Sequence, residues 1–110
     1  MLKPTKFISK FGKKELDHFF EVAKLAKKNQ AFTILKAPSQ QSFGRILAMV
    51  PKKYGTSPER NRLKRQLKAI FTQNKLYEYK LDLIFITRPT AKNYDFSELT
   101  QLLFSLFEKN

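Results

Sequence analysis

The sequence has no cysteine and only one histidine, His18, among its 110 residues. A disulfide scaffold, a thiolate metal site and a cysteine nucleophile are therefore excluded, as is a metal site built from several histidines. Long apolar runs are missing too, because even the longest, such as 46–50 and 83–86, have strand length and fall far short of the roughly 20 residues of a membrane-spanning helix. The amino-terminal lysines are not followed by the apolar stretch of an export signal, so the expected location is the cytoplasm.

Acidic residues are scarce: nine Asp and Glu stand against 22 Lys and Arg, which gives a net charge of +13. The excess is uneven, since residues 45–68 hold eight basic residues and one acid, whereas 31–44 and 69–110 together sum to +1. A one-sided positive field of this kind is typical of a protein that binds a polyanion. Nucleic acid is the leading candidate, ahead of an acidic membrane surface.

The chain nevertheless has the material for a core, with 42% apolar residues and eleven Phe. This content, at this length, predicts one folded domain over 1–110, with 1–13 as a flexible amino-terminal segment. The sequence contains no internal repeat and no linker of the Gly/Ser type.

Apolar residues at helical spacing predict three helices. The first covers 14–28, with lysines in its last turn. The second begins at Thr56-Ser57-Pro58-Glu59, which offers a hydroxyl cap, a first-turn proline and an acid. The third begins at Asp95, with Glu98 placed as in a capping box.

Short apolar stretches predict three strands. Those at 31–37 and 43–50 flank a turn-like segment and suggest an antiparallel pair, whereas 81–87 is almost continuously apolar, as expected of a strand covered on both faces. Because a helix connects 43–50 to 81–87, these two strands should be parallel. The predicted order is α-β-β-α-β-α, an α+β two-layer sandwich of a small mixed sheet with helices packed on it.

The second helix combines a predicted buried stripe with an opposite basic arc. Leu63, Leu67, Ile70 and Phe71 make the stripe, and cations crowd the first two turns on the other side. A cation in the first turn of a helix costs roughly 0.3 to 1 kcal/mol, because it opposes the helix dipole. Such an arrangement is understandable if a phosphate backbone neutralises the cluster, although a merely solvated face remains the alternative.

Two segments carry a resemblance to a known family. They are Phe-Gly-Arg-Ile-Leu-Ala-Met-Val-Pro-Lys-Lys-Tyr-Gly at 43–55 and Arg-Asn-Arg-Leu-Lys-Arg at 60–65. Together they resemble the bacterial ribonuclease P protein subunit, whose signature is a strand, a Lys-Lys-x-Gly turn and an Arg-Asn-Arg-x-Lys-Arg helix. The resemblance extends over about 14–108, and it implies an unusual left-handed crossover between the strands that flank the second helix.

The resemblance also implies a function. The chain would be part of a cytoplasmic ribonucleoprotein that removes the 5′ leader from precursor tRNA, with the catalytic centre and its Mg²⁺ on the RNA subunit and with no cofactor bound by the protein itself. The residues implied for binding the RNA subunit are Lys52, Lys53, Arg60, Asn61, Arg62, Lys64, Arg65 and Lys68. Those expected in a cleft for the single-stranded leader are Leu16, Phe20, Lys24, Phe32, Arg45 and Arg88.

The residues themselves agree that the protein is not a self-contained nuclease, since no paired carboxylates stand at a catalytic spacing. Asp17 and Glu21 lie one helical turn apart, as on any solvated helix, and we assign them no metal. His18 is expected at the surface. Two other functions stay open: a small basic ribosomal or other structural RNA-binding protein, and a membrane-surface protein acting through the first helix.

Overall fold

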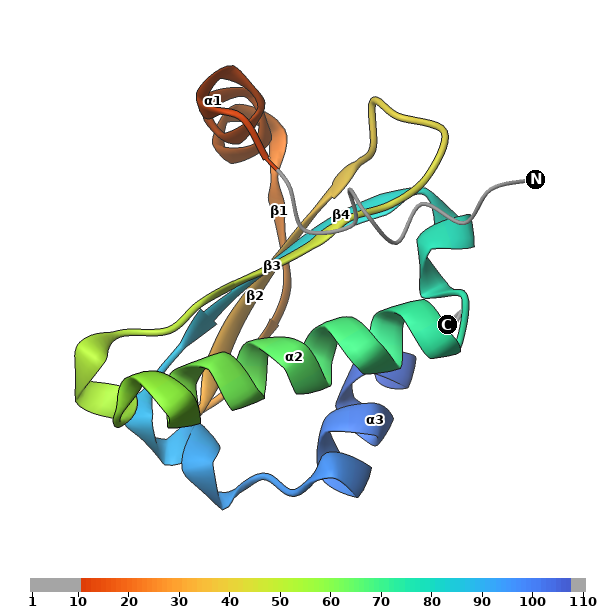
Figure 1. The fold of residues 1–110 in the computed structure, drawn as a ribbon. Coiled ribbons are helices and arrows are strands. Elements are labelled where there is room, and N and C mark those ends of the chain that lie inside the picture. Colours follow the sequence, from red (N-terminus) through yellow and green to blue (C-terminus); the bar gives the residue numbers. More distant parts are fainter. Residues whose placement is uncertain (1–10, 108–110) are drawn as a thin grey trace.

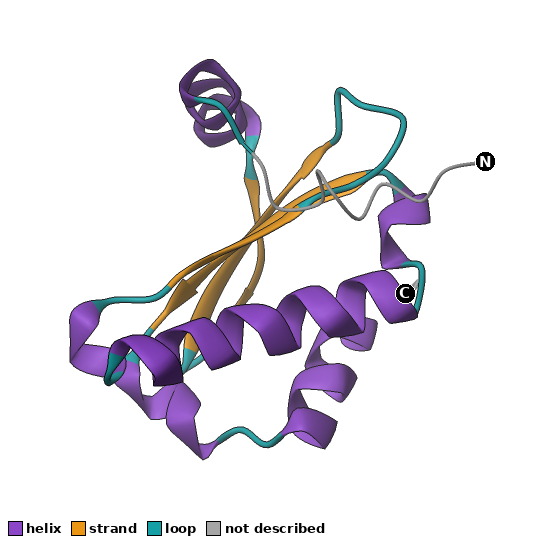
Figure 2. Cartoon of the chain, in the orientation of Figure 1, coloured by secondary structure: helices purple, strands orange, loops and turns teal. Residues whose placement is uncertain are grey.

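The computed structural model describes residues 11–107, and these residues form a four-stranded sheet with helices on both of its faces (Figures 1 and 2). The helices are α1 (Lys13–Val22), α2 (Ser57–Gln73) and α3 (Phe96–Ser105). The strands are β1 (Lys24–Lys28), β2 (Phe32–Pro38), β3 (Ile46–Met49) and β4 (Leu81–Thr87). Short 3-10 turns are η2 (Lys52–Tyr54), η3 (Leu76–Tyr79) and η4 (Pro89–Asn93). The α+β class is confirmed, with one strand more than predicted.

The additional strand, β1, corrects the prediction of a first helix over 14–28. The helix α1 ends at Val22, because Ala23 is extended, with φ −66° and ψ 145°. A continued helix would place Leu25 about 180° from Leu16 and hence opposite the apolar stripe. As a strand, the same segment pairs Leu25 with Leu35 of β2 and packs Ala26 against the main core.

The order of the strands is β1-β2-β4-β3. The predicted antiparallel pairing of 31–37 with 43–50, which are β2 and β3 in the structure, is wrong, because β4 lies between them. The central position belongs to the strand that is apolar on both faces, and β4 has Leu83, Ile84 and Phe85 buried in succession. The predicted parallel pairing across α2 is confirmed, with Ile46 opposite Leu83. The left hand of that crossover stays a prediction.

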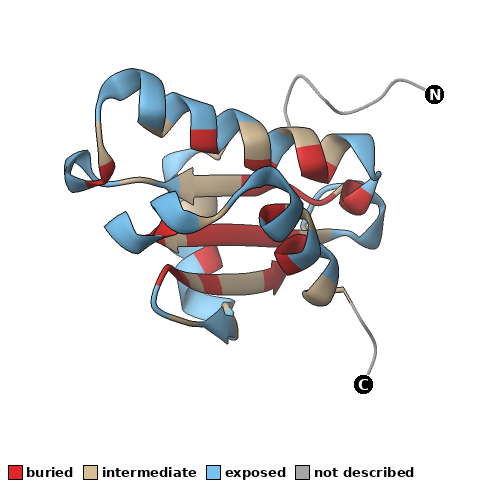
Figure 3. Ribbon diagram, turned by 90° about the horizontal axis from the view of Figure 1, so that it is seen from below, coloured by how far each residue is buried: buried red, intermediate tan, exposed pale blue. Residues whose placement is uncertain are grey.

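The helix α2 begins and packs as its sequence predicts. Thr56 and Glu59 form a capping box, in which the Thr56 hydroxyl accepts from the Glu59 amide and the Glu59 carboxylate accepts from the Thr56 amide. The four predicted stripe residues, Leu63, Leu67, Ile70 and Phe71, are all buried. Each such side chain contributes roughly 1.5 to 3 kcal/mol through burial, so the stripe fixes which arc of α2 faces solvent (Figure 3).

The core has two unequal parts, one on each face of the sheet. The larger part lies under α2 and α3 and includes Phe32, Phe85 and Leu103. The smaller lies under α1, where Phe19 packs with Ala37 and Ile84. Because α1 is short, it covers only one end of its face (Figure 1). This incomplete cover leaves an accessible sheet surface.

The last helix also follows its prediction. Asp95 and Glu98 form a capping box, and Leu99, Leu102 and Leu103 are buried. Of the predicted flexible segment 1–13, residues 1–10 lie outside the described part. Phe11 and Lys13 depart from the prediction, because the Phe11 ring packs edge-on against Phe19 with centroids 6.5 Å apart and Lys13 begins α1.

Candidate nucleic-acid interface

The outer arc of α2 is a continuous polar and cationic surface. We call it the basic face; it comprises Asn61, Arg62, Lys64, Arg65 and Lys68, all of which are exposed. Among residues 11–107, none of its cations forms an ion pair. Lys64 and Lys68 border a hollow of about 230 Å³ against β3, so the basic face reaches from the helix towards the sheet edge. Uncompensated cations in this number are ready to bind a polyanion.

Two more cations precede α2 on the turn η2. Lys52 and Lys53 are exposed, while the next residue, Tyr54, is buried and anchors the turn. Burial raises the pKa of the Tyr54 hydroxyl, with a further contribution from the Glu59 carboxylate. The turn therefore holds the lysine pair in a defined place beside the start of α2, as predicted.

Arg60 differs from the rest of the predicted cluster. It is half-buried at the flank of the apolar stripe, and its guanidinium donates a hydrogen bond to the Ser57 hydroxyl at 2.9 Å. Its Nε atom is buried and has no hydrogen-bond partner among the described residues. Arg60 thus lies beside the basic face and not within it.

The sheet face under α1 is the second candidate surface. Residues opposite one another on adjacent strands share a face, so the strand register defines two rows across the sheet, the first beside Phe19 of α1 and the second farther from it. One row consists of Leu25, Leu35, Ile84 and Leu47. The next consists of Lys28, Thr33, Ile86 and Met49. Only Ile84 is buried, and we call these two rows the open sheet face.

Two predicted cleft residues, Leu16 and Arg88, border this face, and a third, Phe20, lies on α1, the helix that covers its end. Leu16 packs beside Phe19 in the cluster under α1, and Phe20 is 46% exposed next to the buried Phe19. At the other end of the face, the Arg88 guanidinium donates to the Thr33 hydroxyl at 2.5 Å and to the Asn29 carbonyl at 3.1 Å. Apolar and cationic groups are thus combined along one surface, and the exposed ring of Phe20 belongs to the adjoining helix.

The other three predicted cleft residues lie elsewhere. Phe32 is fully buried in the core under α2 and α3, so the expectation of an exposed ring is wrong. Lys24 lies opposite Lys36, and Lys36 is on the same face of β2 as Phe32 because side chains alternate along a strand. Lys24 is therefore on the far side of the sheet from the open sheet face. The β1 cation on the open sheet face is Lys28. A shift of one position along a strand reverses the face, and sequence alone does not fix that parity.

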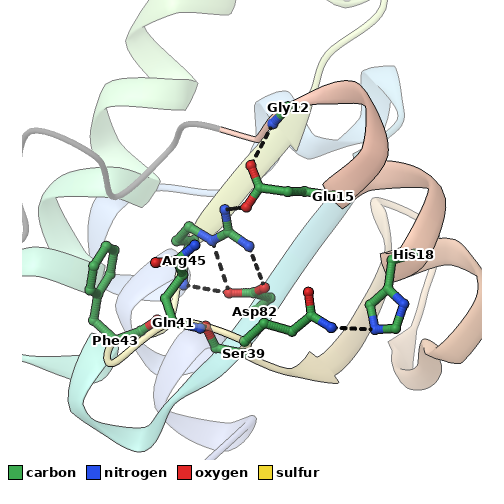
Figure 4. Close-up of polar contacts among 9 residues, drawn as sticks. Gly12, Glu15, His18, Ser39, Gln41, Phe43, Arg45 and Asp82 are labelled. Carbon is green, nitrogen blue, oxygen red and sulfur yellow. Dashed lines mark hydrogen bonds and ion pairs between the residues drawn. The ribbon is translucent and has the colours of Figure 1, made fainter.

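The sequence predicts that Arg45 contacts a phosphate, whereas in the structure Arg45 binds carboxylates of the protein itself (Figure 4). It is 5% exposed, and its guanidinium pairs with the Asp82 carboxylate at 3.0 Å and with the Glu15 carboxylate. Its guanidinium carbon also lies 4.1 Å from the centre of the Phe11 ring. Burial disfavours the charged form, but the hydrogen bonds to Asp82 and Glu15 outweigh it and raise the pKa of Arg45. Arg45 therefore links α1 to the sheet.

Sequence reasoning missed most residues of the open sheet face. The alternating pattern of β2 marks Thr33 and Leu35 as one face, but assigning that face to solvent requires knowing that α1 is short.

Of the remaining predictions, His18 is exposed as expected, with its Nε2 2.9 Å from the Gln40 amide. Within residues 11–107 no helix is long and apolar enough to cross a membrane, and no three potential metal ligands gather.

Comparison with known proteins identifies the family. A sequence model described as Ribonuclease P matches residues 12–110. The chain belongs to the ribonuclease P protein family. The match covers all three helices and all four strands, and it therefore includes both the basic face and the open sheet face.

Individual relatives agree with this assignment. The ribonuclease P protein component of Lactobacillus helveticus is 42% identical over 71 residues, which are 61% of this chain and 57% of the relative's length. That of Petrotoga mobilis is 30% identical over 83 residues, or 71% of this chain and 70% of the relative. That of Clostridium botulinum is 29% identical and covers 87% of both chains.

Solved structures share the fold. The RNase P protein of Staphylococcus aureus has a TM-score of 0.75 at 20% identity, covering 90% of this chain and 91% of the other. That of Thermotoga maritima has a TM-score of 0.72 at 24% identity, covering 89% and 93%. The four-stranded arrangement with three helices is thus a ribonuclease P protein fold.

Proposed function

We propose that this chain is the protein subunit of ribonuclease P, which promotes endonucleolytic removal of the 5′ leader from precursor tRNA. The observation that carries the proposal is the division of α2 into a buried apolar stripe and an exposed, unpaired basic face. Membership of the ribonuclease P protein family supports the reaction. The holoenzyme would act in the cytoplasm.

The basic face and the turn η2 would bind the RNA subunit. Arginine offers two-pronged hydrogen bonds to phosphate, and lysine supplies a point charge, so both can follow a folded RNA backbone. Asn61 lies among these cations and can donate to a sugar or a base edge. Because the apolar stripe fixes the rotation of α2, the helix presents its cations on one side before binding, and the backbone that carries them loses little conformational freedom when they meet the RNA.

The open sheet face would bind the single-stranded leader. Unpaired bases rest on apolar and aromatic side chains, and Leu35, Ile86 and Phe20 supply such contacts. Arg88 and Lys28 would meet the backbone at the end of the face away from α1. This surface and the basic face belong to different elements, so one protein can hold the RNA subunit and the substrate together.

Catalysis would belong to the RNA subunit and its Mg²⁺ ions. Three carboxylates next to the two surfaces already have partners: Glu15 and Asp82 bind Arg45, and Glu59 binds Lys92 and the Thr56 cap. Each of these carboxylates would thus support the protein structure and not take part in the reaction. The protein would contribute by binding and positioning the RNA. A ribosomal or other structural RNA-binding role is the alternative, since it needs the same charge and size.

Reconstitution tests the proposal. The chain is combined with a bacterial ribonuclease P RNA at low magnesium, and cleavage of precursor tRNA is measured with and without protein. We expect the protein to raise cleavage by the RNA and to have no activity when it is free of RNA. Absence of stimulation, together with binding to ribosomal RNA, would favour the structural alternative. Specific 5′ maturation by RNA-free protein would contradict the assignment of catalysis to the RNA subunit.

A further inference from the structure

A second hollow, distinct from the open sheet face, lies where the first turns of α2 meet η2, η4 and the start of α3. Its volume is about 390 Å³, within the range of sites for small organic groups. Its lining includes Tyr54, Arg62, Gln66, Lys92, Tyr94 and Phe96. Three of these side chains are aromatic and two are cationic, and the lining also includes the carboxylates of Glu59 and Asp95, which belong to the capping boxes of α2 and α3. Of the two surfaces described above, the hollow shares only Arg62 with the basic face.

The hollow combines two anchored aromatic side chains, Tyr54 and Tyr94, with the exposed ring of Phe96. Phe96 is the first residue of α3 and follows the Asp95 cap directly, yet it is 44% exposed. Tyr94 packs edge-on against Phe32 with ring centroids 5.4 Å apart, and its hydroxyl accepts a hydrogen bond from the Asn29 amide at 3.2 Å. An exposed phenyl ring next to anchored neighbours is a ready platform for stacking a planar group.

Two polar side chains of the hollow, Gln66 and Arg62, have unused capacity for hydrogen bonds or ion pairs within the described part of the chain. Gln66 makes no side-chain hydrogen bond with the described residues, so its amide can both donate to and accept from the edge of a base. Arg62 has no carboxylate partner in this part of the chain, whereas Lys92 is 3.6 Å from the Glu59 carboxylate and 5.6 Å from the centre of the Tyr54 ring. Arg62 is therefore the cation free to meet a phosphate at the hollow.

We propose that this hollow holds one unpaired nucleobase of the RNA subunit, stacked on Phe96 and hydrogen-bonded to Gln66. The inference rests on the proposed function, because the RNA that binds the basic face must deliver the base. Arg62 belongs to both the basic face and the hollow, so a backbone neutralised by α2 passes the entrance to the hollow. Every base has a face that stacks on an aromatic ring. A peptide ligand would find only Arg62, among the described cations of the hollow, free to bind a carboxylate.

Alanine substitution of Phe96 tests the stacking interaction, and Phe104 provides the matched control. Both are exposed phenylalanines on α3, but Phe104 does not line the hollow. We expect Phe96→Ala to weaken binding of the RNA subunit about 5- to 150-fold, as removal of one stacked base predicts. The slope of log K against log salt should not change, because every phosphate keeps its cation. Phe104→Ala should bind normally. Equal affinities of the two variants would overturn the inference.

Fluorescence gives a second readout that does not depend on affinity. The chain has no tryptophan, so Phe96→Trp introduces a single indole at the hollow and Phe104→Trp introduces one outside it. We expect RNA-subunit binding to quench the indole at 96 and not the indole at 104. Unchanged emission at 96 in a saturated complex would overturn the proposal, as would equal quenching at both positions.

Failure of this inference and failure of the proposed function give different results. If the unmodified chain does not stimulate cleavage by the RNA, the proposed function is wrong. If it does, while Phe96→Ala binds and stimulates as well as the unmodified chain, the hollow does not hold a base. Quenching at 96 by free mononucleotides as strong as that by the RNA subunit would assign the hollow to a small nucleotide and would also overturn the proposal.

Discussion

Arg45 and Asp82 form a buried ion pair that joins the entrance of β3 to the start of β4. The Nη2 and Oδ2 atoms are 3.0 Å apart, and the Arg45 backbone amide also donates to the Asp82 carboxylate at 2.9 Å. Neither residue is more than 5% exposed. Glu15 of α1 reaches the same guanidinium, so one arginine connects α1 with two strands (Figure 4).

Removal of Asp82 should destabilise the fold. Among residues 11–107, Asp82→Ala leaves the buried Arg45 with Glu15 as a carboxylate partner, and breaking a buried pair typically costs about 3 to 5 kcal/mol. We expect a decrease of this size in the free energy of unfolding, measured by urea titration. The control is Asp17→Ala, an exposed residue of α1, which should stay within about 0.5 kcal/mol of the unmodified chain. A similar small change for Asp82→Ala would show that the pair contributes little.

The ion pair of Glu15 with Arg45 should make the position of α1 sensitive to acid. The Gly12 backbone amide and the Arg45 guanidinium lower the pKa of the Glu15 carboxyl below its ordinary 4.5. A carboxyl with a lowered folded-state pKa adds stability above its unfolded value and loses it as the pH falls through the folded value. The stability difference between the unmodified chain and Glu15→Gln should therefore be full near neutrality and shrink below about pH 4.5. A difference that does not vary with pH would contradict this account.

The basic face should determine the salt dependence of RNA binding. Arg62→Ala with Arg65→Ala should reduce the slope of log K against log salt by roughly 0.7 to 0.9 for each phosphate that is no longer neutralised. The charge-matched control is Lys75→Asn with Lys80→Asn, beyond the other end of α2. Both lysines have left-handed backbones, with φ 53° and 57°, a region that Asn tolerates. Equal slopes for the two double variants would indicate that the arginines are only a solvated surface.

Phe19 and Phe20 should separate folding from leader binding. Phe19 is 3% exposed, and its truncation to Ala should cost about 3 to 5 kcal/mol of stability and weaken all binding alike. Phe20 is 46% exposed, so Phe20→Ala should leave the melting temperature nearly unchanged. In the holoenzyme it should weaken binding of precursor tRNA by about 1 to 3 kcal/mol and leave binding of mature tRNA unaffected. Equal weakening for the two RNAs would place Phe20 outside the leader site.

The sequence predicted best those features that local physics controls. The cap at Thr56, the stripe from Leu63 to Phe71 and the outward basic arc all depend on residues within a few turns of one another. Strand order did not follow from local pattern, because the insertion of β4 beside β2 depends on burial of both β4 faces. Phe32 and Thr33 show the same limit, since neighbouring residues of a strand face opposite ways and only the packed helices decide which face is covered.

Among residues 11–107, β1 and β3 form the two edges of the sheet, and β1 is the longer of them. An exposed edge strand invites pairing with another chain, and charged side chains and bulges are the usual protection. The strand β1 has both, since three of its five residues are lysines and its register shifts between Leu25 and Lys27. At the other edge, β3 has only four residues and is soon followed by Pro51. Both borders of the described sheet thus discourage edge-to-edge pairing between chains, which, under the proposed function, would keep newly made chains apart until each one binds RNA.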